Sequence, residues 1–257
     1  MLQFTILEKT YNVAKHSSVK ALDYILSNEL EELDVEIVKI DFNKEKYAEI
    51  TLDGKDEIIA KNFISNNHGT NRSVSTVNVG DQLFGRFKDV GGVKFGSFVD
   101  AGLETSTQKI DALYPLFAMR EQLADGNKVP LMNILRAFGI IENLPMFFEI
   151  TKREILGGKI WVELTEQSLE WIFGALEREK EALILCGTTR RMIKQALTQT
   201  GHAEDIEIIE RIGLLEYRLI CKKGTRADGL IPELGPHLGR TKIGAQVPKR
   251  VLKLFDA

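Results

Sequence analysis

The sequence predicts a multi-domain α+β protein, and three observations support this fold class. Residues 1–70 have the pattern of a β-α-β-β-α unit, and residues 77–151 begin with a glycine-rich hairpin typical of a small β-barrel. Residues 155–257 alternate short strands with helices and end in a basic segment. A chain of 257 residues is long enough for two or three small domains of this kind.

The N-terminal domain, residues 1–70, is expected to be ferredoxin-like or related. Alternating apolar and polar residues predict strands at 2–11, 35–42 and 47–52. Apolar residues at helical spacing predict one helix beginning near Ser17 or Ser18 and a second helix after Gly54. Residues 66–73 lack periodicity and are rich in turn formers, so a linker is expected there.

The central domain, residues 77–151, is expected to be an OB-type barrel with a helical insertion. Two strand candidates flank the turn Asp89-Val90-Gly91-Gly92, a third is predicted at 111–116, and a closing strand at 144–151. Helices are predicted between the third and the closing strand, at 117–124 and 129–138.

The two strands of the hairpin distribute their side chains over two faces. Leu83 and Phe87 are expected in the core, with Phe84, Arg86 and Lys88 on the opposite face. Phe95 and Phe98 are three residues apart, so they share a face only if the intervening Gly96 bends the strand.

The C-terminal domain, residues 155–257, is expected to be of the α/β class. A strand at 159–164, a helix, and a strand at 182–186 predict a right-handed parallel crossover. A helix at 189–199, with Thr188 as its expected N-cap, and strands at 206–212 and 214–222 precede an irregular glycine- and proline-rich end. Residues 211–232 weakly resemble the central hairpin, and both a second OB-like copy and a common hairpin pattern remain open.

Basic residues are concentrated near the C-terminus, although the net charge of the chain is only −3. Tyr217 to Phe255 contains nine lysines and arginines but only two acidic residues, Asp228 and Glu233. Clustered cations release counterions on contact with phosphates, so this asymmetry favours an anionic partner. A solvated basic tail is the alternative interpretation.

Two sets of sequence motifs resemble known protein families. Val79-Gly80-Asp81, Gly85 and Phe95-Gly96-Ser97-Phe98-Val99-Asp100 resemble the RNA-binding OB repeat of ribosomal protein S-one. The repeat implies RNA contact by the aromatic residues of the hairpin, although Pro115 stands where many members carry histidine. The whole chain resembles an archaeal domain-of-unknown-function family, number 2110, through residues 7–12, Pro115 with 120–126, and 228–235. That family implies an archaeal, cytoplasmic setting and no specific activity.

The sequence therefore predicts a non-catalytic, cytoplasmic RNA-binding protein that acts in translation, ribosome biology or transcription, with the ribosome or RNA polymerase as possible further partners. Bases would stack on aromatic side chains while lysines and arginines contact phosphates. The expected RNA contacts are Phe84, Arg86, Lys88, Lys94, Phe95, Phe98, Arg190, Arg191, Tyr217, Lys222, Lys223, Arg226, Arg240, Lys242, Lys249 and Arg250.

Two alternatives remain open. The barrel and its insertion could dock on a protein of the ribosome or of RNA polymerase. The turn Cys186–Arg191 could instead bind a phosphorylated or nucleotide substrate, with Cys186 as a nucleophile. No catalytic residue, cofactor or metal is expected, because the four histidines are scattered and no phosphate-binding loop is present. No apolar run is long enough for a membrane span.

Overall fold

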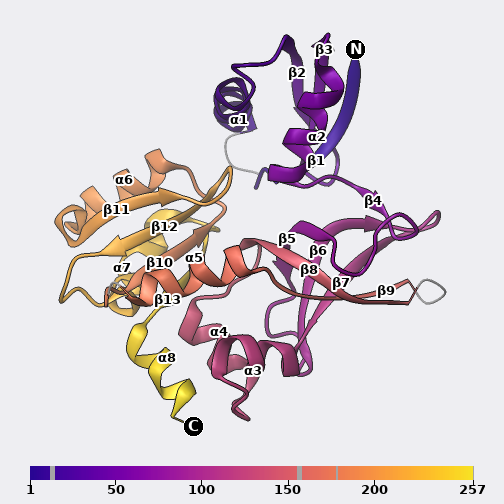
Figure 1. Cartoon of the computed structure of the whole chain (residues 1–257). Coiled ribbons are helices and arrows are strands. Elements are labelled where there is room, and N and C mark those ends of the chain that lie inside the picture. The colour runs from indigo at the N-terminus through magenta and orange to yellow at the C-terminus, as the bar shows by residue number, and fades with distance from the viewer. Residues whose placement is uncertain (12–14, 155–157, 178, 257) are drawn as a thin grey trace.

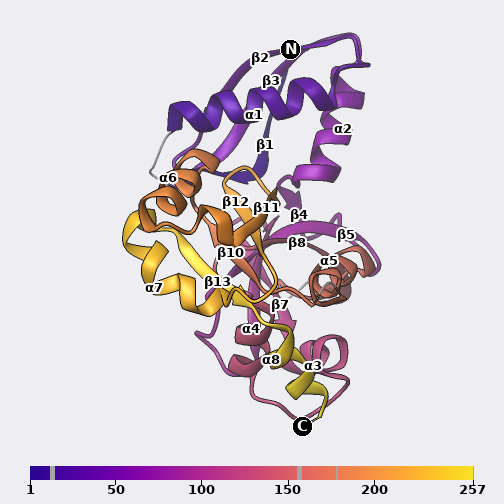
Figure 2. The same ribbon diagram turned by 90° about the vertical axis from the view of Figure 1, so that its left-hand side faces the viewer.

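The computed structural model describes residues 1–11, 15–154, 158–177 and 179–256, and within these ranges it contains eight helices and three separate sheets. Each sheet belongs to one successive part of the chain, and the three parts meet near the middle of the molecule (Figures 1 and 2). The mixed α+β class and the presence of a central barrel are confirmed.

The N-terminal part is a three-stranded sheet covered by two helices. Its order of elements, β-α-β-β-α, is the predicted one. Strand β3 lies between β1 and β2 and is antiparallel to both, which is the arrangement of a split β-α-β unit. The elements are β1 (Leu2–Lys9), α1 (Lys15–Glu29), β2 (Val35–Phe42), β3 (Tyr47–Gly54) and α2 (Glu57–His68).

The expected linker at 66–73 is instead ordered structure. Helix α2 extends to His68, and the short strand β4 (Arg72–Ser73) pairs in parallel with strand β6 of the barrel. The prediction was wrong because turn-forming residues can also end a helix and start an edge strand when a neighbouring domain pairs with them.

The central part is a closed five-stranded barrel. Strand β5 pairs with β6 and β8, β6 with β7, and β8 with β9, all antiparallel. A parallel contact between β7 and β9 closes the ring. Two helices lie between β7 and β8, as predicted. The elements are β5 (Gln82–Lys88), β6 (Gly96–Glu104), β7 (Lys109–Pro115), α3 (Leu116–Ala124), α4 (Leu131–Phe138), β8 (Pro145–Glu154) and β9 (Lys159–Leu164).

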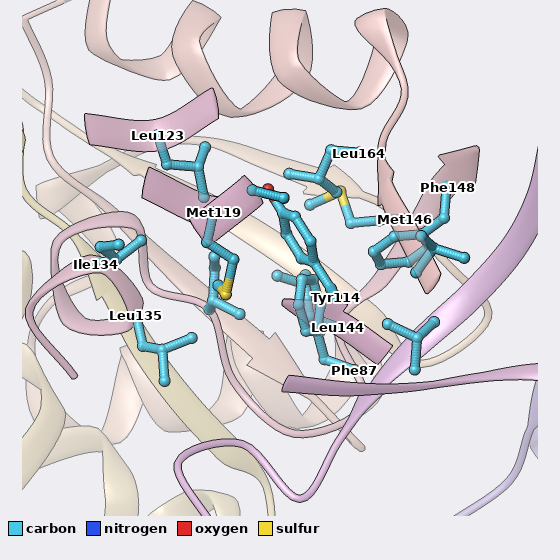
Figure 3. Packing of buried hydrophobic residues seen from close by; sticks show 14 of the residues in the cluster. Phe87, Tyr114, Met119, Leu123, Ile134, Leu135, Leu144, Met146, Phe148 and Leu164 are labelled. Atoms are coloured by element: carbon cyan, nitrogen blue, oxygen red, sulfur yellow. The ribbon is translucent and has the colours of Figure 1, made fainter. Parts of the chain in front are cut away.

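The barrel interior is aromatic and continues into the helical insertion. Phe87, Tyr114 and Phe148 are each at most 1% exposed and pack with ring centroids 5.4–6.4 Å apart. Met119 of α3 and Ile134 of α4 close one end of this core (Figure 3). The predicted inward positions of Leu83 and Phe87 are confirmed.

Strand β9 corrects the predicted C-terminal domain. It pairs with β7 and β8 in the barrel, whereas β10 (Ala182–Cys186) lies in another sheet. The parallel crossover between 159–164 and 182–186 is therefore wrong. An alternating strand pattern fits any sheet with one buried face, and here the open edges of β7 and β8 supply the partners.

The C-terminal part is an open, antiparallel sheet with strand order β11-β12-β10-β13. One sheet face, with Leu183 and Leu185, packs on α6 and α7, and the other face, with Ile184 and Cys186, joins the barrel core. The described residues of this sheet form no second barrel, so the OB-like copy at 211–232 is wrong. The remaining elements are α5 (Glu166–Glu177), α6 (Arg190–Thr200), a 3₁₀ turn (Ala203–Asp205), β11 (Ile206–Arg211), β12 (Glu216–Cys221), α7 (Ala227–Leu238), β13 (Lys242–Gln246) and α8 (Pro248–Phe255).

The basic C-terminal segment is folded rather than irregular. Helix α7 contains Pro232 and Pro236, and it forms because Leu230, Leu234 and Leu238 recur at four-residue spacing and are all buried. Helix α8 packs on α3 and α4 at the lower end of the molecule (Figure 2).

Gly96 allows β6 to start close to β7. A Cβ at this position would lie 2.3 Å from the Tyr114 carbonyl oxygen and 2.9 Å from Pro115 Cα. We expect Gly96→Ala to lower the free energy of unfolding by about 1–3 kcal/mol, because backbone must move to make room. Urea denaturation measures this change. Gly174→Ala in α5, where a Cβ meets nothing within 4 Å, is the control and should be neutral or stabilising. Equal stability of the two variants would contradict the steric argument.

Candidate nucleic-acid interface

A continuous row of outward-facing side chains crosses the barrel strands. Strand register places Lys88 opposite Phe98, Phe98 opposite Leu113, Leu113 opposite Trp161, and Trp161 opposite Lys152. Residues directly opposite each other on neighbouring antiparallel strands have Cβ atoms about 4.5–5.5 Å apart, so the register arranges these five side chains in one line across the barrel face. We call these five residues the aromatic row.

The aromatic row is accessible, and its two ends are cationic. Phe98, Leu113 and Trp161 are each partly exposed. Lys152 Nζ lies 4.8 Å from the Trp161 ring centroid, a cation–π contact, and Lys88 Nζ lies 2.8 Å from an Asp111 carboxylate oxygen. The row thus combines a partly exposed apolar surface with a lysine at either end, of which Lys88 is paired with Asp111.

Phe95 extends the row beyond the strand. Its ring is 57% exposed and meets Phe98 edge to face, with centroids 6.3 Å apart. The two predicted aromatic side chains therefore lie together. Phe95 lies just before β6, which begins at Gly96 with a φ of 157° and pairs regularly with β7 up to Val99. Lys94 is exposed beside this pair.

The N-terminal domain borders the other side of the barrel face. Tyr47 donates a hydrogen bond to Asp100, and Lys109 pairs with Glu45. Lys9 and Lys109 both lie over the Tyr47 ring, 5.3 and 5.5 Å from its centroid. Burial lowers the pKa of Lys9. These cations were missed by the sequence analysis, because the turn that presents Tyr47 belongs to a different domain.

Three of the predicted RNA contacts lie inside the protein. Phe84 is 8% exposed, and Arg86 and Tyr217 are 1% exposed. Phe84 and Arg86 do point outward from the barrel, as the alternation predicts, but the N-terminal domain covers them; Tyr217 packs in the core beneath α6 and α7. These three residues are therefore corrected to interior positions and are excluded from the candidate surface.

Arg86 is the centre of an ion cluster to which all three domains contribute. Its guanidinium lies 2.7 Å from a Glu8 oxygen and 2.9 Å from a Glu216 oxygen. Arg86 also donates to the carbonyl oxygens of Leu7, at 2.8 Å, and Asn143, at 3.2 Å. Glu8 belongs to β1, Arg86 to β5 and Glu216 to β12. The residue predicted to contact a phosphate instead joins the domains.

His68 extends this cluster into the N-terminal helices. Its Nδ1 lies 3.0 Å from Glu8 and its Nε2 2.9 Å from Glu29. Burial alone would lower the pKa of His68, but hydrogen bonds to the two carboxylates raise it to about 9. Burial would raise the pKa of Glu8, but the His68 hydrogen bond and the Arg86 charge lower it to about 2. We call Glu8, His68, Arg86 and Glu216 the central ion cluster.

The predicted C-terminal cations do not form one track. Arg190 and Arg191 begin α6, which covers the sheet face opposite the barrel, so the C-terminal sheet separates them from the aromatic row. Arg226 and Arg250 both pair with Asp228, and Lys222 pairs with Glu204. The other predicted cations of this part are exposed: Lys223, Arg240, Lys242 and Lys249.

A basic groove connects the barrel with the C-terminal domain. It has a volume of about 690 Å³ and lies between α4 and β13. Arg136, Lys242 and Arg250 line it, together with Glu142 and with Val90 of the β5–β6 turn. The same turn leads along the chain into Lys94 and Phe95, although neither residue lines the groove. Arg136 was missed because it lies on a helix whose apolar face dominates the sequence pattern.

The Cys186–Arg191 turn does not supply a nucleophile. The Cys186 thiol is 1% exposed, and burial raises its pKa well above the usual range. The N-cap of α6 is Thr189 rather than the predicted Thr188, and Thr189 Oγ1 accepts a hydrogen bond from the Met192 amide at 3.2 Å. In the described ranges, no group of three or more potential ligands could hold a metal ion. None of the described helices is long and apolar enough to cross a membrane.

Comparison with known families covers nearly the whole chain. Residues 3–73 match the DUF2110 N-terminal domain, 77–176 the DUF2110 central domain, and 180–245 the DUF2110 C-terminal domain. The chain belongs to the DUF2110 family. The central DUF2110 model includes β9 and α5, in agreement with the observed barrel. No S-one repeat is among the matched families, so the resemblance of the hairpin to that repeat stays a prediction.

Two further comparisons add little to the DUF2110 assignment. A search of curated proteins gave no match. One similar solved structure is the crystal structure of the a/eIF2alpha-aDim2p-rRNA complex from Pyrococcus horikoshii OT3, at 12% identity and a TM-score of 0.26. That match covers 49% of this chain and 64% of the other. A TM-score this low carries no conclusion about fold or function.

Proposed function

We propose that this DUF2110 protein binds single-stranded RNA, without chemistry, on the open face of its central barrel. The observation that carries the proposal is the aromatic row, in which Phe98, Leu113 and Trp161 are flanked by Lys88 and Lys152. Unstacked bases find flat apolar partners on such a surface, and lysines at its ends reach the phosphates.

The barrel architecture supports the same proposal. A five-stranded barrel with a helical insertion between its third and fourth strands is what we expect of an OB-type domain, whose second and third strands form a nucleic-acid-binding face. Phe98 on β6 and Leu113 on β7 occupy those two strands. We further propose that the bound strand continues into the basic groove and that the protein acts in translation, ribosome biology or transcription.

Binding of a labelled single-stranded RNA, followed by fluorescence anisotropy at increasing salt, tests the proposal. We expect Phe98→Ala and Trp161→Ala each to weaken binding roughly 5- to 150-fold, because one stacked base is worth about 1–3 kcal/mol. Wild-type affinity should fall as salt rises, because phosphate contacts release counterions.

The control is Tyr24→Ala on α1, an aromatic side chain that is 70% exposed and lies outside the candidate surface. It should bind like the wild type. Affinity that is independent of salt, or equal in the wild type and both barrel variants, would rule out this function.

A docking role is the second candidate function, and one observation favours it. The helical insertion exposes Phe117, at 67%, and Met132, at 40%. If this surface docks on a ribosomal or polymerase protein, Phe117→Asp should abolish co-sedimentation with that complex while leaving the affinity for single-stranded RNA unchanged.

A further inference from the structure

A polar cavity lies where the N-terminal domain meets the barrel. It has a volume of about 360 Å³, at the small end of the range for ligand pockets. The end of α2, strands β4, β5 and β8, and the start of α5 contribute to its walls. It is distinct from the aromatic row, and of the predicted RNA contacts only Phe84 is among its described lining residues.

The polar lining of this cavity consists mainly of amide side chains. Asn66, Asn67, Gln82 and Gln167 all face it, and Arg72 supplies a cation. Within the described residues these five side chains have no hydrogen-bond or ion-pair partner. They are therefore available to a ligand. The lining contains no carboxylate, so nothing in it repels an anionic group.

Ser65 lies in the wall of the cavity and is only 7% exposed. Its Oγ is fully buried and has no hydrogen-bond partner among the described residues, so this oxygen does not reach the cavity and takes no part in the inference.

Two aromatic rings form a fixed apolar wall. Phe84 and Phe147 meet edge to face with centroids 5.5 Å apart. Gly69, with φ of 69°, brings the backbone against this wall, since a Cβ there would lie 3.0 Å from Phe84 Cδ1 and 2.8 Å from Leu7 Cδ1. The wall is thus held in place before any ligand arrives.

We infer that this cavity binds the base of an unpaired nucleotide. Amide side chains offer a donor and an acceptor side by side, which matches the mixed donor and acceptor edges of a base. Aromatic rings supply the apolar contact that an unstacked base requires, and Arg72 would meet the attached phosphate. A free mononucleotide and a nucleotide within an RNA strand present the same chemistry. Binding of a nucleotide that is part of an RNA strand rests on the proposed RNA-binding function.

The experiment measures binding to the full chain by two probes. Isothermal titration uses the four nucleoside monophosphates, and anisotropy uses the labelled single-stranded RNA. The variants are Gln82→Ala and Gln167→Ala, whose exposed side chains can be removed without loss of core packing. Glu170→Ala, exposed on the same helix as Gln167 but outside the cavity lining, is the matched control.

Each cavity variant should lose roughly tenfold in affinity for at least one probe, since a well-placed amide pair discriminates a base by that order. The control should not change. A loss of affinity for the monophosphates identifies a free nucleotide as the ligand. A loss of affinity for the RNA alone shows that the cavity binds a base of the RNA strand. If neither affinity changes in any cavity variant, the inference is overturned.

The two proposals fail separately. RNA binding that depends on Trp161 but not on Gln167 or Gln82 would leave the proposed function standing without the cavity. Monophosphate binding that depends on Gln167, in a protein that binds no RNA, would leave the cavity standing without the proposed function.

Discussion

Arg86→Met lowers the free energy of unfolding by about 3–5 kcal/mol, the cost of leaving buried charge without its partner. Two carboxylates, Glu8 and Glu216, are at most 3% exposed and would lose their shared cation. Two backbone carbonyl oxygens, of Leu7 and Asn143, would lose their donor as well. Because these partners belong to three domains, the domains should also unfold less cooperatively.

Urea denaturation monitored by tryptophan fluorescence and by circular dichroism measures both effects. Lys88→Met is the control, since Lys88 lies two residues along the same strand and pairs with Asp111, but its side chain is 43% exposed. An exposed pair is worth about 0–1 kcal/mol. A loss below about 1 kcal/mol in Arg86→Met, similar to that in the control, would show that the central ion cluster does not hold the domains together.

Neutralising Glu8 and Glu216 should restore part of the stability that Arg86→Met loses. In the triple variant Glu8→Gln, Arg86→Met, Glu216→Gln, no net charge remains buried between the three positions, and Gln can still accept the backbone hydrogen bonds from Leu214 and Leu215. Recovery of stability relative to Arg86→Met would identify unpaired charge, rather than lost packing, as the main cause.

Stability should decrease by about 3 kcal/mol between pH 6.5 and pH 9 through the titration of His68 alone. The folded protein raises the pKa of His68 from 6.5 to about 9, because Glu29 and Glu8 hydrogen-bond the ring despite its burial. A raised pKa means that the folded state binds the proton more tightly than the unfolded chain does. The contribution is therefore complete below pH 6.5 and is lost as the pH rises through 9, at about 1.4 kcal/mol per unit.

Free energies of unfolding of the wild type and His68→Gln, measured from pH 6 to pH 10, test this assignment. The difference between the two proteins should shrink across the window, because the variant has no proton to lose. Glu8 does not interfere, since its pKa of about 2 keeps it ionised throughout. His237→Gln, at an exposed position on α7, should follow the wild-type curve. If the free energies of unfolding of the wild type and of His68→Gln changed in parallel with pH, His68 would not be the group that titrates.

Much of the fold was predictable because it depends on local patterns. Helical spacing placed α4 within two residues of its observed start, and alternation put Leu83 and Phe87 in the barrel core. Strand β9 was recognised as a strand but assigned to the wrong sheet. The alternation of apolar and polar residues in β9 indicates that one face of the strand is buried. It does not indicate which neighbouring strand pairs with it.

The candidate site was predictable only in part, for the same reason. Phe95 and Phe98 were found, because the glycine between them is visible in the sequence. Trp161 and Lys152 were missed, since their place in the aromatic row depends on the closure of the barrel by β9. Arg86 was placed on the correct face of its strand, but a different domain buries that face.

From the sequence alone it was possible to derive most of the strands and helices before residue 222, the inward and outward sides of the hairpin, and the basic character of the C-terminal part. The outward side chains that meet solvent, and the cations that pair with carboxylates, became known only from the packing of the three domains. Side-chain periodicity reflects the local backbone, which neighbouring residues control. The burial of Arg86 depends on Glu8 and Glu216, which are 78 and 130 residues away along the chain and come within hydrogen-bonding distance only when the three domains pack together.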